Sequence, residues 1–121
     1  MIGAIPVLRL GRTLLASIQV DLSDAIAESL QNDILAHIER GRTTGVVVDI
    51  SGFDTVDTYA ARVLAETAKM AKLMGCDTIL VGMRPEVAAT LVRMGYYPME
   101  EVTFALNLEE GLALLGHIVP K

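Results

Sequence analysis

The chain has 121 residues, of which 52% are hydrophobic and 4% aromatic, and it carries a net charge of −5. This length predicts a single domain over residues 1–121. The acidic balance excludes a nucleic-acid partner, which would need a basic stripe or stacking rings. The high apolar share indicates either a dense core or apolar surface meant for a protein partner, and composition does not separate the two.

The compartment is indicated by what the sequence lacks. Cys76 is the one cysteine, so a disulfide within the chain is impossible, which fits a reducing compartment. The first residues have no charged region followed by an apolar run, so no signal peptide is expected. No apolar stretch reaches about 18 residues, so no membrane contact is expected either. We therefore expect a cytoplasmic, bacterial-type protein.

The first third of the chain predicts a β-hairpin followed by a helix. Two apolar runs, 5–10 and 13–19, are separated by two residues, which is typical of a hairpin. Residues 21–24 then offer N-cap side chains, and the helix is expected to end near Gly41. Its apolar stripe at helical spacing is Ile26, Leu30, Ile34 and Ile38.

Strands and helices alternate through the middle of the chain. The β-branched run 46–50 predicts a strand buried on both faces, and a second such strand is expected over 77–82. Helices are predicted over 58–74 and 85–94, the latter with proline in its first turn. The inner stripe of the first of these helices is expected to be Ala60, Val63, Leu64, Thr67, Ala71 and Met74.

The last elements complete an α/β pattern. A short edge strand is expected within 98–104, and Asn107 with Glu110 resembles a capping box that opens a final helix. The order predicts a mixed, mostly parallel sheet with an antiparallel first strand, flanked by about four helices. Partners of such sheets meet the loops at the carboxyl ends of the strands, here 51–57 and 82–86.

No motif for catalysis or cofactor binding is found in the sequence. The glycines form neither GxGxxG nor GxxxxGK[ST], and Ser51 does not lie in GxSxG. His37 and His117 lie in helical patterns without a second ligand four residues on, and Cys76 is interpreted as a packed thiol. We expect a protein that is not an enzyme and that holds no metal and no cofactor.

Residues 49–60, DISGFDTVDTYA, concentrate acidic and hydroxyl side chains between a strand and a helix. Thr58 falls at the helix start, where free N–H groups and the helix dipole favour a phosphate. The simpler interpretation is that Asp57 or Thr58 only caps the helix. Asp49 as a phosphate-receiving aspartate is disfavoured, because an acidic pair after the first strand and a lysine after the last are both missing.

At this segment the sequence resembles the STAS family of bacterial anti-sigma factor antagonists. The D-[ST]-x-[AG] element of that family is matched by residues 57–60, its V-V-V-D-I strand by 46–50 and its V-G-M-R-P turn by 81–85. Within the family the chain is similar to the small RsbS-like scaffold proteins of the stressosome. The features that carry this likeness lie at residues 5–6, 15–19, 72–75 and 85–91.

The resemblance implies a signalling role without catalysis. RsbS-like scaffolds co-assemble with the STAS domains of RsbR-like sensor proteins into a large shell that sequesters a switch serine/threonine kinase. Under stress the kinase phosphorylates the scaffold and leaves, and a dedicated phosphatase resets it. By this likeness the phosphoacceptor is Thr58. Partner contacts are expected from Asp54, Asp57, Tyr59, Met83 and Arg84.

Two alternatives remain beside the scaffold. The chain is either a subunit of a large hetero-oligomer or a free-standing antagonist that binds one anti-sigma kinase, and particle size would separate them. A weak nucleotide hydrolase is disfavoured by the missing phosphate loop and base. The chain also departs from RsbS-like proteins, which usually carry serine where it has Thr58. The extra β-methyl crowds the hydroxyl, which predicts slower phosphorylation or slower reset.

Overall fold

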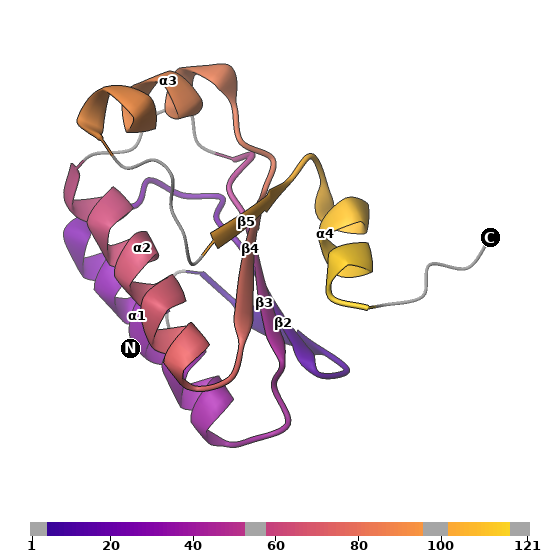
Figure 1. Ribbon diagram of the computed structural model, residues 1–121. Helices are drawn as coiled ribbons and strands as arrows, with labels where there is room; N and C mark the ends of the chain where they lie inside the picture. The colour runs from indigo at the N-terminus through magenta and orange to yellow at the C-terminus, as the bar shows by residue number, and fades with distance from the viewer. Residues whose placement is uncertain (1–4, 53–57, 96–101, 117–121) are drawn as a thin grey trace.

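The computed structural model is a mixed sheet with helices on both faces (Figure 1). It describes residues 5–52, 58–95 and 102–116. The strands of its 5-stranded sheet lie in chain order, β1-β2-β3-β4-β5. They are β1 (Val7–Leu10), β2 (Thr13–Ser17), β3 (Gly45–Asp49), β4 (Asp77–Val81) and β5 (Val102–Ala105). Of the neighbouring pairs, β1 with β2 is antiparallel and the other three are parallel.

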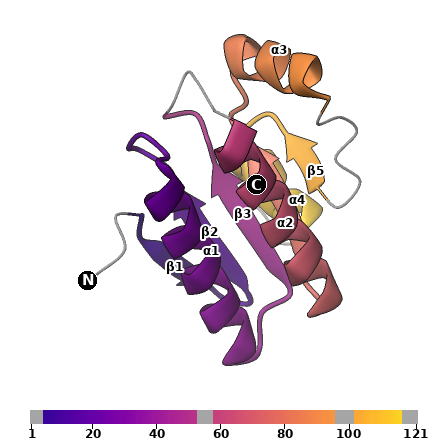
Figure 2. The ribbon, with the colours of Figure 1, turned by 90° about the vertical axis from the view of Figure 1, so that its left-hand side faces the viewer.

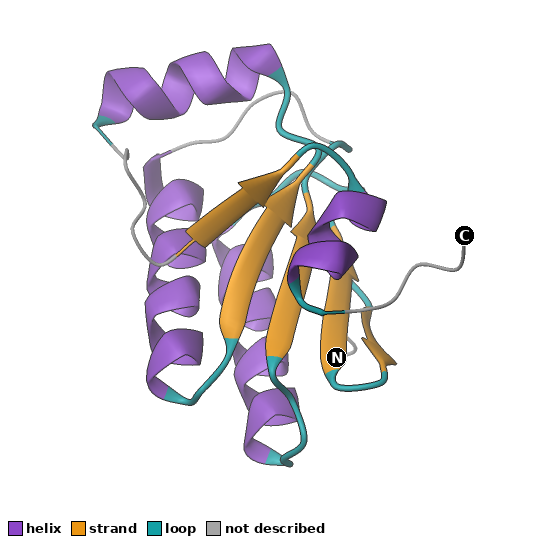
Figure 3. Cartoon of the chain, turned by 45° about the vertical axis from the view of Figure 1, so that its right-hand side comes forward, coloured by secondary structure: helices purple, strands orange, loops and turns teal. Residues whose placement is uncertain are grey.

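The described residues form four helices. They are α1 (Asp24–Glu39), α2 (Thr58–Leu73), α3 (Pro85–Met94) and α4 (Leu108–Leu114). Helices α1 and α2 lie side by side on one face of the sheet (Figure 2), and α4 packs on the opposite face (Figure 3). Helix α3 lies beyond the carboxyl ends of the parallel strands (Figure 1). None of the helices in the described ranges is long and apolar enough to cross a membrane.

The predicted order of elements and the antiparallel first strand are confirmed. The final strand, expected within 98–104, begins at Val102, and residues 98–101 lie outside the described part of the chain. Met74 is a wrong prediction, because α2 ends at Leu73 and Met74 is 44% exposed in the turn that follows. The inner face of α2 is instead continued by small side chains, which let the helix approach α1 and the sheet closely.

Most of the core lies between the sheet and the pair α1 and α2. Strand β3 crosses its centre and is buried on both faces, as predicted. Val46 and Val48 point toward the α1–α2 side, while Val47 belongs to the cluster under α4. Each such fully buried aliphatic side chain contributes about 1.5–3 kcal/mol to folding. This rigid strand fixes the position from which the polar segment after Asp49 begins.

Helix α4 is held close to the sheet by a glycine. A Cβ at Gly111 would lie 2.8 Å from Val81 Cγ1, so a larger residue would push the helix outward. The side chain of Asn107 caps the helix by accepting a hydrogen bond from the Glu110 amide at 2.9 Å. The predicted capping box is wrong in its second half, because the Glu110 carboxylate accepts from the amide of Leu106 and not from that of Asn107.

Candidate functional site

The candidate site begins where β3 ends. One carboxylate oxygen of Asp49 accepts hydrogen bonds from the Ser51 backbone amide at 2.9 Å and from the Ser51 hydroxyl at 2.7 Å. Asp49 is therefore engaged in shaping the turn that leads toward α2.

The loop after β4 lies directly against this turn. Gly82 has φ 78°, and a Cβ there would lie 2.8 Å from the Cβ of Ser51. Only glycine combines this backbone conformation with such a close approach. Arg84, which is exposed, donates a hydrogen bond from Nε to the Ser51 carbonyl at 3.1 Å. The start of α3 is thus tied to the chain that follows β3.

Thr58 is the first residue of α2 and is exposed. Its hydroxyl is 3.9 Å from the sulfur of Met94, a weak acceptor at the end of α3. The first turn of α2 contains no acidic residue, whereas those of α1, α3 and α4 do. A negative group attached to Thr58 would therefore meet the positive end of a helix dipole without a carboxylate in the same turn.

Tyr59 is directed toward α1. Its hydroxyl donates a hydrogen bond to the carboxylate of Glu28, and this bond raises the pKa of Tyr59 above its ordinary value. The guanidinium of Arg62 lies 5.5 Å from the centre of the Tyr59 ring, at cation–π distance. The ring is half-buried and joins α2 to α1 while leaving one part accessible.

The predicted site residues are therefore brought together in two groups. Arg84, just before α3, is bonded to Ser51, which follows β3. Met94, the last residue of α3, contacts Thr58, the first residue of α2. Tyr59 is engaged with α1 instead. Met83 is half-buried and packs against the main core. Asp54 and Asp57 lie outside the described residues.

Met94 was not predicted as part of the site. The sequence placed it only at the end of a helix. Its contact with Thr58 depends on how α3 turns back over α2, and no local pattern encodes that crossing.

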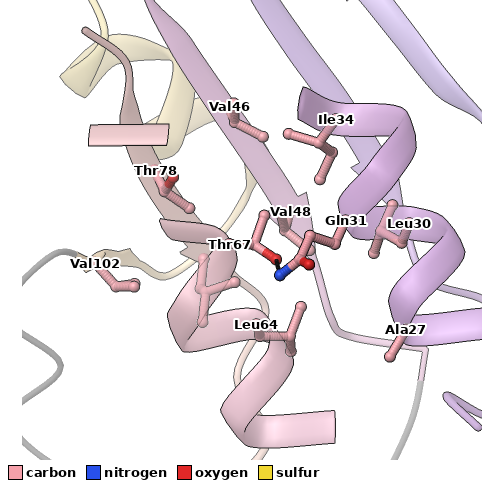
Figure 4. A pocket seen from close by; sticks show the side chains of 11 residues that line it. Ala27, Leu30, Gln31, Ile34, Val46, Val48, Leu64, Thr67, Thr78 and Val102 are labelled. Carbon is pink, nitrogen blue, oxygen red and sulfur yellow. Dashed lines mark hydrogen bonds between the residues drawn. The ribbon is translucent and has the colours of Figure 1, made fainter. Parts of the chain in front are cut away.

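A small internal pocket lies between α1, α2 and the sheet (Figure 4). Its volume of about 10 Å³ is roughly that needed for one water molecule. The Gln31 side-chain amide donates to the hydroxyl of Thr67 at 2.9 Å, while the hydroxyl of Thr78 is buried with no hydrogen-bond partner among the described residues. The pocket is too small for a substrate or cofactor.

The remaining titratable candidates have structural partners. His37 Nδ1 lies 2.7 Å from the Asp33 carbonyl, a helical contact one turn back. Cys76 is buried, as predicted, and its thiol donates to the Thr43 carbonyl at 3.1 Å. Burial raises the pKa of this thiol. Within the described ranges no group of three acidic, histidine or cysteine side chains could hold a metal ion.

The candidate site is a surface formed by loops and helix ends, and it carries the exposed hydroxyl of Thr58. The family model of the STAS domain matches residues 4–111. The chain belongs to the STAS domain family. The matched range begins before β1 and ends within α4.

Solved structures of similar proteins place this STAS domain near stressosome proteins. A serine-to-glutamate variant of RsbS from Moorella thermoacetica is 32% identical, with a TM-score of 0.82 over 93% of this chain and 95% of that chain. A chain in a structure of the stressosome, described as a signal integration and transduction hub, is 33% identical, with a TM-score of 0.78 over 92% of this chain and 96% of that one.

A curated relative is longer than the chain. The RsbT co-antagonist protein RsbRA of Bacillus subtilis is 30% identical over 99 residues, which are 82% of this chain and 34% of RsbRA. The chain therefore spans about a third of that relative, and the likeness concerns its STAS part only.

Proposed function

We propose that this STAS domain is a non-catalytic scaffold of a stressosome-type complex, which holds a switch serine/threonine kinase and releases it when Thr58 is phosphorylated. The observation that carries the proposal is the exposed Thr58 hydroxyl at the start of α2, whose one hydrogen-bond contact among residues 5–52, 58–95 and 102–116 is to the weakly accepting sulfur of Met94. A kinase can therefore reach this hydroxyl without first breaking a strong bond to any described residue.

The surroundings of Thr58 supply a reason for release. A phosphate would add nearly two negative charges beside the apolar thioether of Met94, next to the start of α2. Val92, two residues earlier on α3, is 52% exposed and offers an apolar contact for a partner. Charge introduced beside such a contact weakens docking by desolvation and repulsion.

The likeness to stressosome proteins supports the proposed partners. The chain aligns with RsbS and with a stressosome chain over more than 90% of its length, at 32% and 33% identity. RsbRA, one of the curated relatives, is named as an RsbT co-antagonist. We therefore propose co-assembly with RsbR-like STAS proteins, with a cognate phosphatase to restore the unmodified state.

The direct test is intact mass after incubation with the cognate switch kinase and ATP. One added phosphate is expected on the parent chain and none on Thr58→Ala. Thr103→Ala, which removes an exposed threonine on β5, is the matched control and is expected to gain the phosphate. Thr58→Ser is expected to be modified faster, because the β-methyl is gone. A phosphate that persists in Thr58→Ala would refute the assignment.

Particle size tests the scaffold role separately. When the chain is mixed with an RsbR-like protein, we expect a large assembly that binds the kinase and loses it after phosphorylation. A one-to-one complex with a kinase, and no larger particle, would instead support the free-standing antagonist.

A further inference from the structure

A second concentration of charged side chains lies at the end of the sheet opposite Thr58. The β1–β2 turn and the end of α1 both lie there, away from α3 (Figure 1). Together they line a pocket of about 430 Å³ that is open to solvent. Its lining consists of Arg9, Arg12, Arg40, Arg42, His37 and two glycines. None of these described lining residues is acidic.

The clustering stands out in an acidic chain. The net charge is −5, and 10 residues are lysine or arginine. Four of those basic residues line this one pocket, and all four are arginines. Like charges repel at short range, and the described lining supplies no carboxylate to offset this repulsion, so the cluster favours a bound anion.

The side chain of Arg9 joins β1 to the end of α1 and the residues that follow it. Its guanidinium donates to the backbone carbonyls of His37 at 3.4 Å and Arg42 at 3.3 Å, near the negative end of the α1 dipole. The side chains of Arg12, Arg40 and Arg42 make no hydrogen bond or ion pair with any residue in the described ranges. Three guanidinium groups therefore remain available to a ligand.

The backbone at the pocket is strained. Arg42 has φ 66°, and it is the one described residue other than glycine with a positive φ. This conformation costs an arginine about 1 kcal/mol, which glycine would avoid. Strain of this kind gathers at binding sites, where the side chain is needed in that place.

We propose that this pocket binds a small molecule that carries a diphosphate group. The planar guanidinium presents paired donors that match phosphate oxygens, and three such groups suit an anion with more than one phosphate. The pocket volume lies within the usual range for small-ligand sites, about 300–1,000 Å³. The described lining contains no phenylalanine, tyrosine or tryptophan, so recognition rests on the phosphates and not on a large stacking ring. This site is independent of the function proposed for Thr58.

Calorimetric titration of the full chain with inorganic pyrophosphate tests the proposal. Binding is expected, and Arg12→Gln or Arg40→Gln should each weaken it about tenfold, as loss of a charge-assisted contact does. Arg93→Gln is the matched control, since Arg93 is an exposed arginine on α3 and lies outside the pocket. Equal weakening by the control would overturn the site, because it would indicate only a general effect of charge.

Arg42→Gly separates binding from folding. It removes a guanidinium and relieves the positive φ, so we expect weaker pyrophosphate binding without a lower urea midpoint. Wild-type affinity in this variant would overturn the assignment of Arg42 to the ligand.

The source of the diphosphate is distinguished by parallel titrations. Tighter binding of ADP or GDP than of pyrophosphate would identify a nucleotide, and equal binding would identify the diphosphate alone. Both outcomes support the site. Binding of sulfate as tight as that of pyrophosphate would overturn it. So would binding of an oligoglutamate peptide in the absence of pyrophosphate binding, because that would indicate a protein-docking surface.

Discussion

Arg84 anchors the start of α3 to the connection that leads to Thr58. Its Nε donates to the Ser51 carbonyl at 3.1 Å. A hydrogen bond from a charged donor is worth about 1.5–3 kcal/mol, and solvent reduces this at an exposed position. We therefore expect Arg84→Ala to lower the free energy of unfolding by about 0.5–1 kcal/mol, which corresponds to a decrease in Tm of about 2–5 °C for a chain of this size.

A second substitution separates the loss of the Arg84–Ser51 hydrogen bond, called the tether below, from the change in the free energy of unfolding. Arg84 is the N-cap residue of α3, with φ −84° and ψ 149°, and its side chain makes no capping bond. Arg84→Asn removes the tether but supplies a good N-cap, worth about 1 kcal/mol. Because the two effects offset each other, this variant should unfold near the wild-type urea concentration.

Loss of the tether is measured by hydrogen exchange at the backbone amide of Ser51, which donates a hydrogen bond to Asp49. We expect faster exchange in both Arg84 variants and a lower urea midpoint in Arg84→Ala alone. Arg93→Ala, in the last turn of α3, is the control for loss of an exposed arginine. The reasoning is refuted if Arg84→Ala and Arg93→Ala share one urea midpoint and Ser51 exchanges at the wild-type rate.

Two further predictions concern the core. Thr78→Val removes a buried hydroxyl without a partner among the described residues and should raise the free energy of unfolding by about 1 kcal/mol. Thr67→Val breaks hydrogen bonds to Gln31 and Val63 and should lower the free energy of unfolding by about 1 kcal/mol. A lower urea midpoint for Thr78→Val would show that the Thr78 hydroxyl is satisfied. The pKa of Cys76 is raised above 9.0, chiefly by burial and also by Asp77, so the folded state holds the thiol proton more tightly than the unfolded state. Its contribution to stability is present below pH 9.0 and is lost as pH rises through the folded pKa, so the urea midpoint should fall more in wild type than in Cys76→Ala between about pH 8 and 10. Parallel curves for the two chains would contradict this.

The fold was predictable because its strands and helices have strong local patterns. The run at 46–50 is β-branched throughout, and the structure buries β3 on both faces. Helix α1 begins after Ser23, whose side chain accepts from the Ile26 amide, in the N-terminal segment where the sequence predicts a cap. Gly95 ends α3 with φ 79°, as a glycine after a helix predicts. These features depend on neighbours within a few residues along the chain.

The site was predictable only in part, because its contacts join distant segments. The sequence placed Thr58 at a helix start, but the contact with Met94 spans 36 residues. The partner contact expected of Tyr59 stays a prediction, and the bond of its hydroxyl to Glu28, 31 residues away, was not predicted. The arginine pocket was missed for the same reason, since Arg9 and Arg42 meet only when the β1–β2 turn lies beside the end of α1. Tertiary packing decides each of these contacts.

Helix α3 connects the proposed phosphorylation to the rest of the surface. It is held at its start by the bond between Arg84 and Ser51, and through Val87 and Leu91, which are buried in the core. Its last residue, Met94, lies against Thr58. A phosphate on Thr58 therefore acts on the end of the helix while the start stays fixed, so we expect the last turn of α3 to move and to carry the exposed Val92 with it. In Arg84→Ala the bond to Ser51 is lost while Val87 and Leu91 still hold α3 on the core, so we expect a phosphate to displace the last turn further than in the parent chain.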